Sequence, residues 1–184
     1  GAIASGGGAE QYQADKKYDE AVAAAVEECA EDTAGQTCYI CMDGAAEEGL
    51  VRMCACRGHS GVAHVSCLVR QAQIAVQQGL ENEENNLVPR LKWWWSCRLC
   101  EQHHHGALES ALGWACWKTY LGRPEGDHLR NIALQILSDS IYDDPGGRLA
   151  ILELILARLK TETDDPTRLL YVRAQIAKCL AGLE

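Results

Sequence analysis

Cysteine and histidine residues recur at short spacings in the middle of the chain. They form four close pairs in which one or two residues separate the partners: Cys38 with Cys41, Cys54 with Cys56, His64 with Cys67, and Cys97 with Cys100. Such a pair lets one turn of the backbone direct two donor atoms at one ion, and two pairs complete the tetrahedral shell of Zn²⁺. Four pairs in sequence rarely arise by chance. We therefore predict two structural zinc ions held by these eight side chains.

The predicted zinc ions are structural rather than catalytic. A zinc ion closed by four protein ligands keeps no position for a water molecule, so we expect no hydrolytic zinc chemistry. Each such site can contribute on the order of 10 kcal/mol to folding. No G-x-S-x-G, Walker or G-x-G-x-x-G pattern occurs elsewhere in the sequence. The sequence therefore predicts no catalytic residue.

Other histidines and cysteines offer competing ligands. His59 follows Cys56 by three residues, but its use would abandon the pair of His64 and Cys67. The run His103–His105 follows the last pair, and adjacent side chains diverge too much to reach one ion. We expect His59 in a loop and the histidine run in a solvated turn. The remaining cysteines stand singly on helical stripes, where buried packing is expected: Cys29, Cys116 and Cys179.

The order and spacing of the four pairs resemble the RING-CH, or RING-variant, zinc finger. The segments CYIC, CACRGHSGVAHVSC and CRLC match that pattern across residues 38–100. Over a longer stretch, including HGALESALGWACWKTYLGRPE, the chain is similar to proteins of unicellular algae that join such a finger to tetratricopeptide-like repeats. The resemblance implies a cross-brace with two ligand sets: Cys38, Cys41, His64 and Cys67 on one zinc ion, and Cys54, Cys56, Cys97 and Cys100 on the other.

The same resemblance implies a protein partner. RING-type fingers receive a ubiquitin-conjugating enzyme in a groove between the two zinc loops. Ile40, immediately before Cys41, takes a groove position with the apolar character that the family uses, and we expect Leu99, immediately before Cys100, to contact the partner as well. For Ile40, a role as a filler inside the zinc loop is equally compatible with its position.

Two features depart from the pattern of active RING-CH ligases. Such fingers usually carry a Trp in the helix after the His-x2-Cys pair, where this chain has LVRQAQIAVQQ. Active RING ligases often place a basic residue directly after the final cysteine, and here that residue is Glu101. The competing family is the PHD finger. PHD fingers usually place more residues within the second cysteine pair and fewer between that pair and the histidine. This chain has one residue within the pair and seven before the histidine. Trp95 lies where PHD fingers often place an aromatic residue.

Three adjacent tryptophans precede the last cysteine pair. The segment LKWWWSC predicts a short strand, in which Trp94 faces away from Trp93 and Trp95. One face of this strand is then buried, and Trp93 and Trp95 are candidates for an aromatic wall that binds a peptide. Packing beside the zinc loop is the alternative interpretation for at least one of them.

Helices are predicted on both sides of the cysteine-rich segment. Residues 1–12 are rich in Gly and Ala and are expected to be flexible, whereas residues 14–32 predict a helix. Within the finger, residues 66–79 predict a helix and residues 81–86 an exposed loop. Further helices are expected over residues 107–121, 127–142 and 148–160, with Asp144 and Asp165 as N-caps ahead of prolines.

The C-terminal helices show a repeating pattern. Leu129, Ile132, Gln135 and Ile136 recur about forty residues later as Leu169, Val172, Gln175 and Ile176. This period predicts antiparallel helical repeats, and a non-repeating helical bundle is the alternative. Together with the resemblance, it gives the expected fold: a small zinc-stabilised cross-brace α+β finger followed by an all-α antiparallel helical-repeat region of tetratricopeptide-like type. Residues 1–35 would supply a flexible N-terminus and one helix, residues 36–105 the finger, and residues 106–184 the repeats.

Composition and charge exclude several function classes. The 184 residues include 26 acidic and 17 basic side chains, giving a net charge of −9, the wrong sign for a protein that binds a phosphate backbone. No run of roughly 18 apolar residues predicts a membrane span. Ten cysteines in mostly close pairs favour a reducing compartment, cytosolic or nuclear. The start GAIASGGGAE lacks Met and a signal pattern, so we expect a fragment or processed piece that is not secreted.

The sequence thus predicts a zinc-binding RING-CH-type protein-interaction module. We expect it to act as, or derive from, a RING-type ubiquitin ligase that positions a ubiquitin-conjugating enzyme while the helical repeats recruit a protein or peptide substrate. The alternative is a non-catalytic scaffold or PHD-like peptide reader whose two zinc ions only maintain the fold.

Overall fold

The computed structural model of the chain describes residues 5–81, 87–141, 143–162 and 166–182. Its elements in chain order are α1 (Ser5–Thr33), β1 (Leu50–Val51), β2 (Ala63–His64), α2 (Val65–Glu81), α3 (Leu87–Leu91), the 3-10 helix η1 (Lys92–Trp94), α4 (Gly106–Tyr120), α5 (His128–Ser140), α6 (Pro145–Glu162) and α7 (Pro166–Ala181). The two strands pair antiparallel, with Leu50 opposite His64. The prediction of a finger with little regular structure followed by helices is confirmed. The tetratricopeptide-like repeat type stays a prediction.

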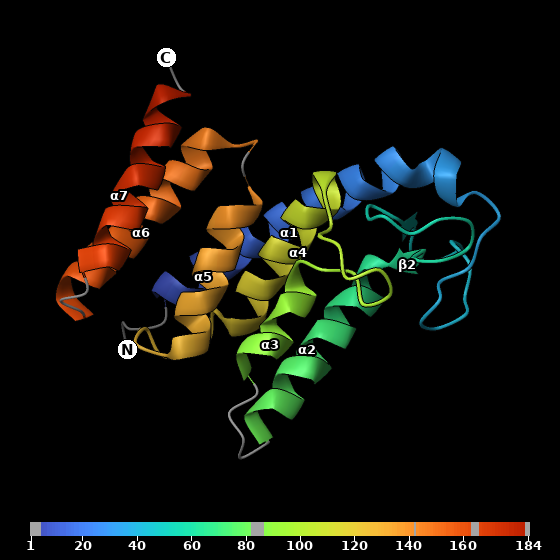
Figure 1. Cartoon of the computed structure of the whole chain (residues 1–184), viewed down its shortest axis with the longest axis horizontal. Coiled ribbons are helices and arrows are strands. Elements are labelled where there is room, and N and C mark those ends of the chain that lie inside the picture. Colours follow the sequence, from blue (N-terminus) through green and yellow to red (C-terminus); the bar gives the residue numbers. More distant parts are fainter. Residues whose placement is uncertain (1–4, 82–86, 142, 163–165, 183–184) are drawn as a thin grey trace.

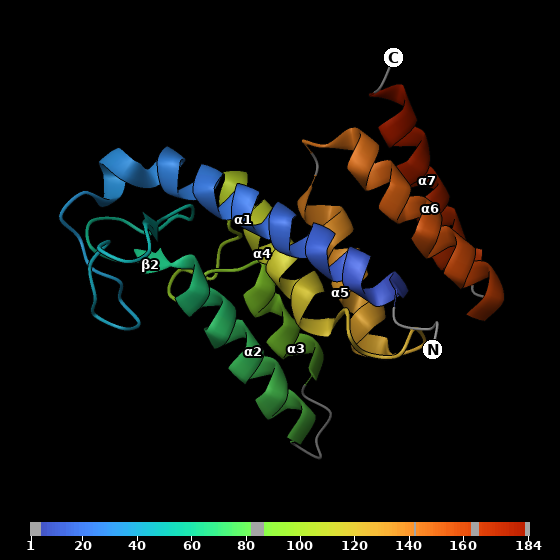
Figure 2. The same ribbon diagram turned by 180° about the vertical axis from the view of Figure 1, so that it is seen from behind.

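Helix α1 forms a brace along one side of the molecule. It runs beside α4 from the finger loops toward α5, and the pair of α6 and α7 lies at the opposite end from the loops (Figures 1 and 2). At its N-terminal part, the Glu10 carboxylate lies 3.5 Å from Arg130 Nη2 of α5. Ala14 is buried in the same core as α4. The prediction of a flexible segment is therefore wrong for residues 5–12, because contacts distant in sequence stabilise the helix there.

Helix α4 is the centre of the helical part, since α1, α2 and α5 all contact it. Its buried residues cover most of the circumference of the helix, among them Leu108, Ala111 and Trp117. The approach of α5 depends on Gly113, because a Cβ atom there would lie 1.8 Å from Ser140 Oγ. The absence of a side chain at this position lets the two helices pack at short range.

Two helix starts are capped by aspartates, of which Asp144 was predicted as a cap and Asp127 was not. The Asp127 carboxylate accepts hydrogen bonds from the backbone N–H groups of Leu129 (2.9 Å) and Arg130 (3.3 Å) at the start of α5. The Asp144 carboxylate accepts from Gly147 N–H at 2.9 Å, with Pro145 as the first residue of α6. The predicted cap at Asp165 lies outside the described residues.

The predicted strand over LKWWWSC is wrong, because this segment forms the end of α3, then η1 and a turn. The backbone N–H of Ser96 donates to Lys92 O at 2.9 Å, and only Ser96 and His103 form a bridge of β type here. Trp94 is 1% exposed and meets Tyr120 edge-on, with ring centroids 6.0 Å apart. Trp93 and Trp95 are half-buried and pack against the same core as Trp94, so the predicted opposition of Trp94 to its neighbours is wrong together with the strand.

The single cysteines are buried, as predicted: Cys29, Cys116 and Cys179. Among the described residues, no helix combines the length and apolarity that a bilayer crossing requires.

Candidate metal centres

The eight predicted ligands come together in two groups of four. The first zinc site consists of Cys38, Cys41, His64 and Cys67, and the second zinc site consists of Cys54, Cys56, Cys97 and Cys100. Within each group, all donor atoms lie within 4.8 Å of one another. Each group therefore surrounds one point, as a single coordinated ion requires.

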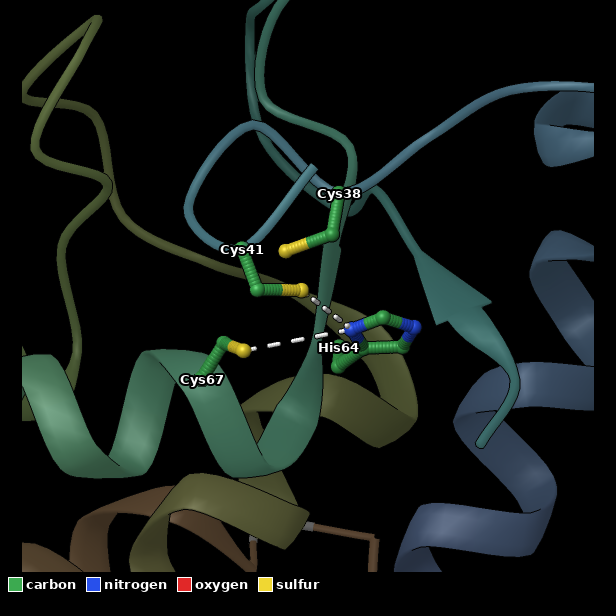
Figure 3. A group of neighbouring side chains, drawn as sticks. All are labelled: Cys38, Cys41, His64 and Cys67. Atoms are coloured by element: carbon green, nitrogen blue, oxygen red, sulfur yellow. Dashed lines mark hydrogen bonds between the residues drawn. The ribbon is translucent and has the colours of Figure 1, made fainter. Parts of the chain in front are cut away.

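The first zinc site converges from a turn and from the junction of β2 with α2 (Figure 3). His64 Nδ1 lies 3.3 Å from Cys41 Sγ and 3.9 Å from Cys67 Sγ. A tetrahedral zinc ion with bonds of about 2.3 Å to sulfur and about 2.0 Å to nitrogen separates these atoms by roughly 3.6 Å. The observed distances bracket this value, so the site fits a zinc ion.

The orientation of His64 is fixed by its second ring nitrogen. Nε2 lies 3.0 Å from the carbonyl oxygen of Gly44, which can only accept a hydrogen bond. The proton therefore resides on Nε2, and the lone pair of Nδ1 faces the three thiols. A histidine that binds a metal is commonly held in this way, with its other nitrogen donating to a carbonyl.

The second zinc site joins the Cys54–Cys56 turn to the turn after Trp95. Cys56 Sγ lies 3.8 Å from Cys97 Sγ, close to the roughly 3.8 Å edge of a tetrahedron with Zn–S bonds of about 2.3 Å. Gly61, with φ of +78°, covers this site from the side: a Cβ there would lie 2.6 Å from Cys56 Cβ and 2.9 Å from its Sγ. Only a glycine allows this approach. Two zinc ions thus fit the two groups.

Two turns of the same form hold half of the ligands. In the turn from Cys38 to Asp43, which we call the first knuckle, Cys38 N–H donates to Asp43 O at 2.8 Å and Met42 N–H donates to Cys38 O at 2.9 Å. The second knuckle, from Cys97 to Gln102, repeats both bonds at 2.9 Å.

Backbone amides in these knuckles point at the cysteine sulfurs. Ile40 N–H donates to Cys38 Sγ, and Leu99 N–H donates to Cys97 Sγ, each at 3.4 Å. Burial raises the pKa of Cys38, but amides that include that of Ile40 outweigh it and lower the pKa to about 7. The hydrogen bond from Cys54, with the knuckle amides, lowers the pKa of Cys97 to about 4. The first cysteine of each knuckle therefore favours the thiolate, which is the form that binds zinc, whereas the pKa of Cys41 is raised.

The two ligand groups interleave along the sequence. The first zinc site uses the first and third pairs, and the second uses the second and fourth. This is the cross-brace that the resemblance implied. Because each site ties together segments that are distant in sequence, neither half of the finger can close its site alone.

Polar contacts distant in sequence attach the finger to the helices. Arg52 donates to both carboxylate oxygens of Asp32 near the end of α1 and also to the carbonyl oxygen of Gly58 in the loop after Cys56. Near the first zinc site, Glu48 accepts hydrogen bonds from the backbone and hydroxyl of Ser66 at the start of α2. These contacts hold the zinc loops against α1 and α2.

The remaining candidate residues differ in exposure. Ile40 is half-buried against the core beneath the first zinc site, and Leu99 is 51% exposed. Trp93 has Lys92 Nζ 4.3 Å and the Arg98 guanidinium carbon 4.8 Å from its ring centre. His59 is exposed and belongs to neither ligand group.

The prediction that the histidine run is exposed to solvent is wrong for one of its three residues. His103 and His105 are exposed, but His104 is 4% exposed. Its backbone N–H donates to Trp95 O at 2.8 Å, which turns the side chain inward.

Sequence reasoning missed the supporting residues Gly61, Gly44 and Glu48. The G-V-A-H segment in which Gly61 precedes His64 carried a signal, since a glycine between ligand pairs often marks close approach of the backbone. No sequence signal pointed to the carbonyl of Gly44 or the carboxylate of Glu48, because their contacts with His64 and Ser66 depend on how the loop before β1 folds back.

Comparison with known proteins supports the geometry. A family model described as the RING-variant domain matches residues 38–86. No curated protein and no solved structure matches the chain significantly. The matched residues contain six of the eight ligands, and Cys97 and Cys100 beyond them complete the second zinc site. The chain therefore carries a zinc-binding RING-variant domain together with a mostly helical remainder.

Proposed function

We propose that this RING-variant chain is a protein-interaction module that acts as, or derives from, a RING-type ubiquitin ligase. The observation that supports this best is the pair of closed, interleaved Cys/His sites, six of whose eight ligands lie within the RING-variant match. The zinc ions have a structural role in this proposal, since four protein ligands at each site leave no position for a reacting water. The finger offers no covalent nucleophile, so catalysis would arise from positioning a ubiquitin-conjugating enzyme that carries activated ubiquitin.

The two knuckles provide the surface for that enzyme. Ile40 and Leu99 occupy the same position in each knuckle, and the backbone N–H of each is fixed by a cysteine sulfur. This bond holds the backbone at each of the two positions. Leu99 is exposed enough to lose apolar surface on binding, and Ile40 contributes the part that is not packed against the core.

The helices provide the surface for a protein or peptide substrate in this proposal. We assign residues 36–105 to the finger, residues 106–184 to helices of tetratricopeptide-like type, and residues 1–35 to an N-terminal segment that includes the brace helix α1. On α7, Leu170, Tyr171 and Leu180 are large hydrophobic side chains that are 64%, 49% and 50% exposed. Exposed apolar residues of this kind are common at protein interfaces.

A non-catalytic scaffold or peptide reader is the second candidate, and Glu101 favours it. This acidic side chain lies directly after the last zinc ligand and forms an ion pair with Lys92, with 3.4 Å between Oε2 and Nζ. A positive charge at this place is what the ligase resemblance requires. Trp93 and Trp95 would then serve as part of a peptide-binding surface.

The experiment that separates the candidates is self-ubiquitination of the zinc-loaded chain with a panel of conjugating enzymes. We expect chains to form with at least one enzyme and Ile40→Ala to reduce both chain formation and enzyme binding by about fivefold or more, as loss of a partly buried interface side chain does. Ile74→Ala is the matched control, because Ile74 is an exposed apolar residue of α2 outside the knuckles.

Two outcomes decide the matter. If no conjugating enzyme supports chain formation and Ile40→Ala leaves the affinity for every partner unchanged, the ligase proposal is refuted and the scaffold remains. If Ile40→Ala and Ile74→Ala reduce activity equally while both retain two zinc ions, the knuckles are not the binding surface.

A further inference from the structure

A cavity of about 370 Å³ opens where the segment after α3 meets α4 and α5. This volume lies in the range of ligand pockets, on the order of 300–1,000 Å³. It is distinct from both zinc sites, since none of the eight ligands lines it. Its walls combine aromatic, aliphatic and acidic side chains, the principal ones being Trp94, Trp95, Ile132, Ile136, Glu109 and Asp139.

The apolar part of the cavity suits the stem of a long side chain. Trp94 is buried and Trp95 half-buried, and they come from the turn that leads into the second zinc site. Ile132 and Ile136 lie one turn apart on α5 and form the facing wall. Methylene groups placed between indole rings and isoleucine side chains lose their contact with water, which stabilises the bound state.

The acidic part of the cavity is only partly neutralised, by an ion pair of Asp139 with Arg148. Within the described part of the chain, Glu109 forms no side-chain hydrogen bond or ion pair. Asp139 accepts hydrogen bonds from the Gln135 amide at 3.2 and 3.3 Å, and its nearest cation is Arg148 Nη2 at 4.0 Å.

The two carboxylates are partly desolvated, since Glu109 is half-buried and the Asp139 side chain is 49% exposed. Burial raises the pKa of Glu109, and the negative charge of Asp139 raises it further, whereas His103 acts in the opposite direction. Burial raises the pKa of Asp139 as well, against the effects of Gln135 and Arg148. Carboxylates that are partly desolvated and near each other gain from a cation that replaces their lost hydration.

We propose that this cavity binds a lysine or arginine side chain of a partner protein, with the aliphatic stem against Trp95 and Ile136 and the cationic head toward Glu109 and Asp139. The net charge of −9 adds long-range attraction for a basic segment. The aromatic rings favour a cation over a neutral group of the same length. The inference goes beyond the proposed function and holds whether or not the finger activates a conjugating enzyme.

The test is an NMR titration of the whole zinc-loaded chain with capped pentapeptides Gly-Gly-Xaa-Gly-Gly. The probes carry lysine, arginine or norleucine at Xaa, so norleucine keeps the stem and removes the charge. We expect saturable shifts of the Trp95 indole N–H and the Ile136 methyl signals with both cationic peptides. Norleucine should bind about fivefold or more weakly, the loss expected for one partly desolvated charge contact.

Two separate variants and one control assign the acidic groups. Glu109→Gln and Asp139→Asn each remove one charge with little change in shape, and we expect each to weaken the lysine peptide by about threefold or more. Glu31→Gln removes the same charge from an exposed position of α1 and should leave the affinity unchanged. Retention of two zinc ions and a dispersed amide spectrum shows that each variant is folded.

The proposal is overturned by any of three results. These are the absence of saturable shifts with both cationic peptides up to their solubility limit, equal affinity for the norleucine peptide, and wild-type affinity in both folded acid variants. Because the titration contains neither a conjugating enzyme nor ubiquitin, its failure leaves the proposed ligase function untouched, and failure of the ligase assay leaves this site untouched.

Discussion

Met42 and Glu101 occupy the same place in the two knuckles, each directly after the second cysteine and each with a left-handed backbone. Their φ values are 67° and 57°, and each backbone N–H donates at 2.9 Å to the carbonyl of the first cysteine in its pair. A positive φ is uncommon for residues other than glycine. The knuckle hydrogen bonds and the zinc ligands impose it here, so the Glu101 side chain has a defined position at the edge of the finger.

Glu101→Arg tests whether that position controls ligase activity. The wild-type carboxylate pairs with Lys92 and is 68% exposed, so replacing it alters charge with little effect on packing. If the finger is a ligase, arginine would contact ubiquitin and chain formation would rise by about two- to fivefold, the effect of one exposed charge contact. The rate of chain formation is measured at equal zinc content.

Glu101→Gln is the control for Glu101→Arg, because it removes the acid without adding a base. We expect a smaller gain from glutamine than from arginine. Equal rates for the two variants would mean that only the ion pair with Lys92 mattered, and unchanged rates for both would separate this position from activity.

Gly61→Ala is expected to abolish one zinc site. A Cβ at Gly61 would overlap the side chain of Cys56 and lie 3.2 Å from Cys54 Sγ, so the second zinc site must open or the loop must move. We expect zinc content to fall from two ions per chain to one after dialysis, as measured by elemental analysis. Gly58→Ala is the matched control, because Gly58 also has a positive φ (+61°) but has nothing within 4 Å of a Cβ. Equal zinc loss in both variants would assign the effect to backbone strain instead.

The two zinc sites were predictable from the sequence because metal ligation restricts both residue type and spacing. Their interleaving came from the family resemblance, since spacing alone permits other ways to join the pairs. Helices α4 and α5 were predicted from the helical pattern of the sequence, and the cap at Asp144 from residue type. Errors arose where distant contacts decide local structure: Glu10 with Arg130 in α1, and Trp94 with Tyr120 after α3. Neither contact has a local signal.

Gly113→Ala is expected to separate α4 from α5. The added methyl group would overlap Ser140 Oγ and lie 2.7 Å from Ser140 Cβ, and overpacking of this kind lowers the free energy of unfolding by about 1–3 kcal/mol. Adding Ser140→Gly should remove the overlap, so Gly113→Ala would cost less in that background. The measurement is chemical denaturation at saturating zinc. Gly122→Ala is the control, because nothing lies within 4 Å of its Cβ position. Equal costs of Gly113→Ala in both backgrounds would contradict the predicted contact.

The cap at the start of α5 gives a prediction that separates capping from charge. Asp127→Ala removes the acceptor for two backbone N–H groups and should lower the free energy of unfolding by about 1 kcal/mol, or the melting temperature by about 2–4 °C. Asp127→Asn keeps a capping oxygen and loses only the ion pair with Arg123, where Nε and Oδ1 are 2.8 Å apart, so its effect should be smaller.

The pH dependence of the same pair of variants follows from the carboxyl group. The hydrogen bond from Arg123 lowers the pKa of Asp127 below its ordinary value. The contribution of the ionised carboxylate to the free energy of unfolding is therefore complete above the pKa that Asp127 has in the unfolded chain. It is lost only as the pH falls through the lower pKa of the folded state. From about pH 6 to 8, the difference in melting temperature between wild type and Asp127→Asn should stay constant, because the carboxyl is ionised in both states. Equal destabilisation by alanine and asparagine would show that Asp127 acts through its charge and not as the cap of α5, and a difference that changes across this range would contradict the lowered pKa.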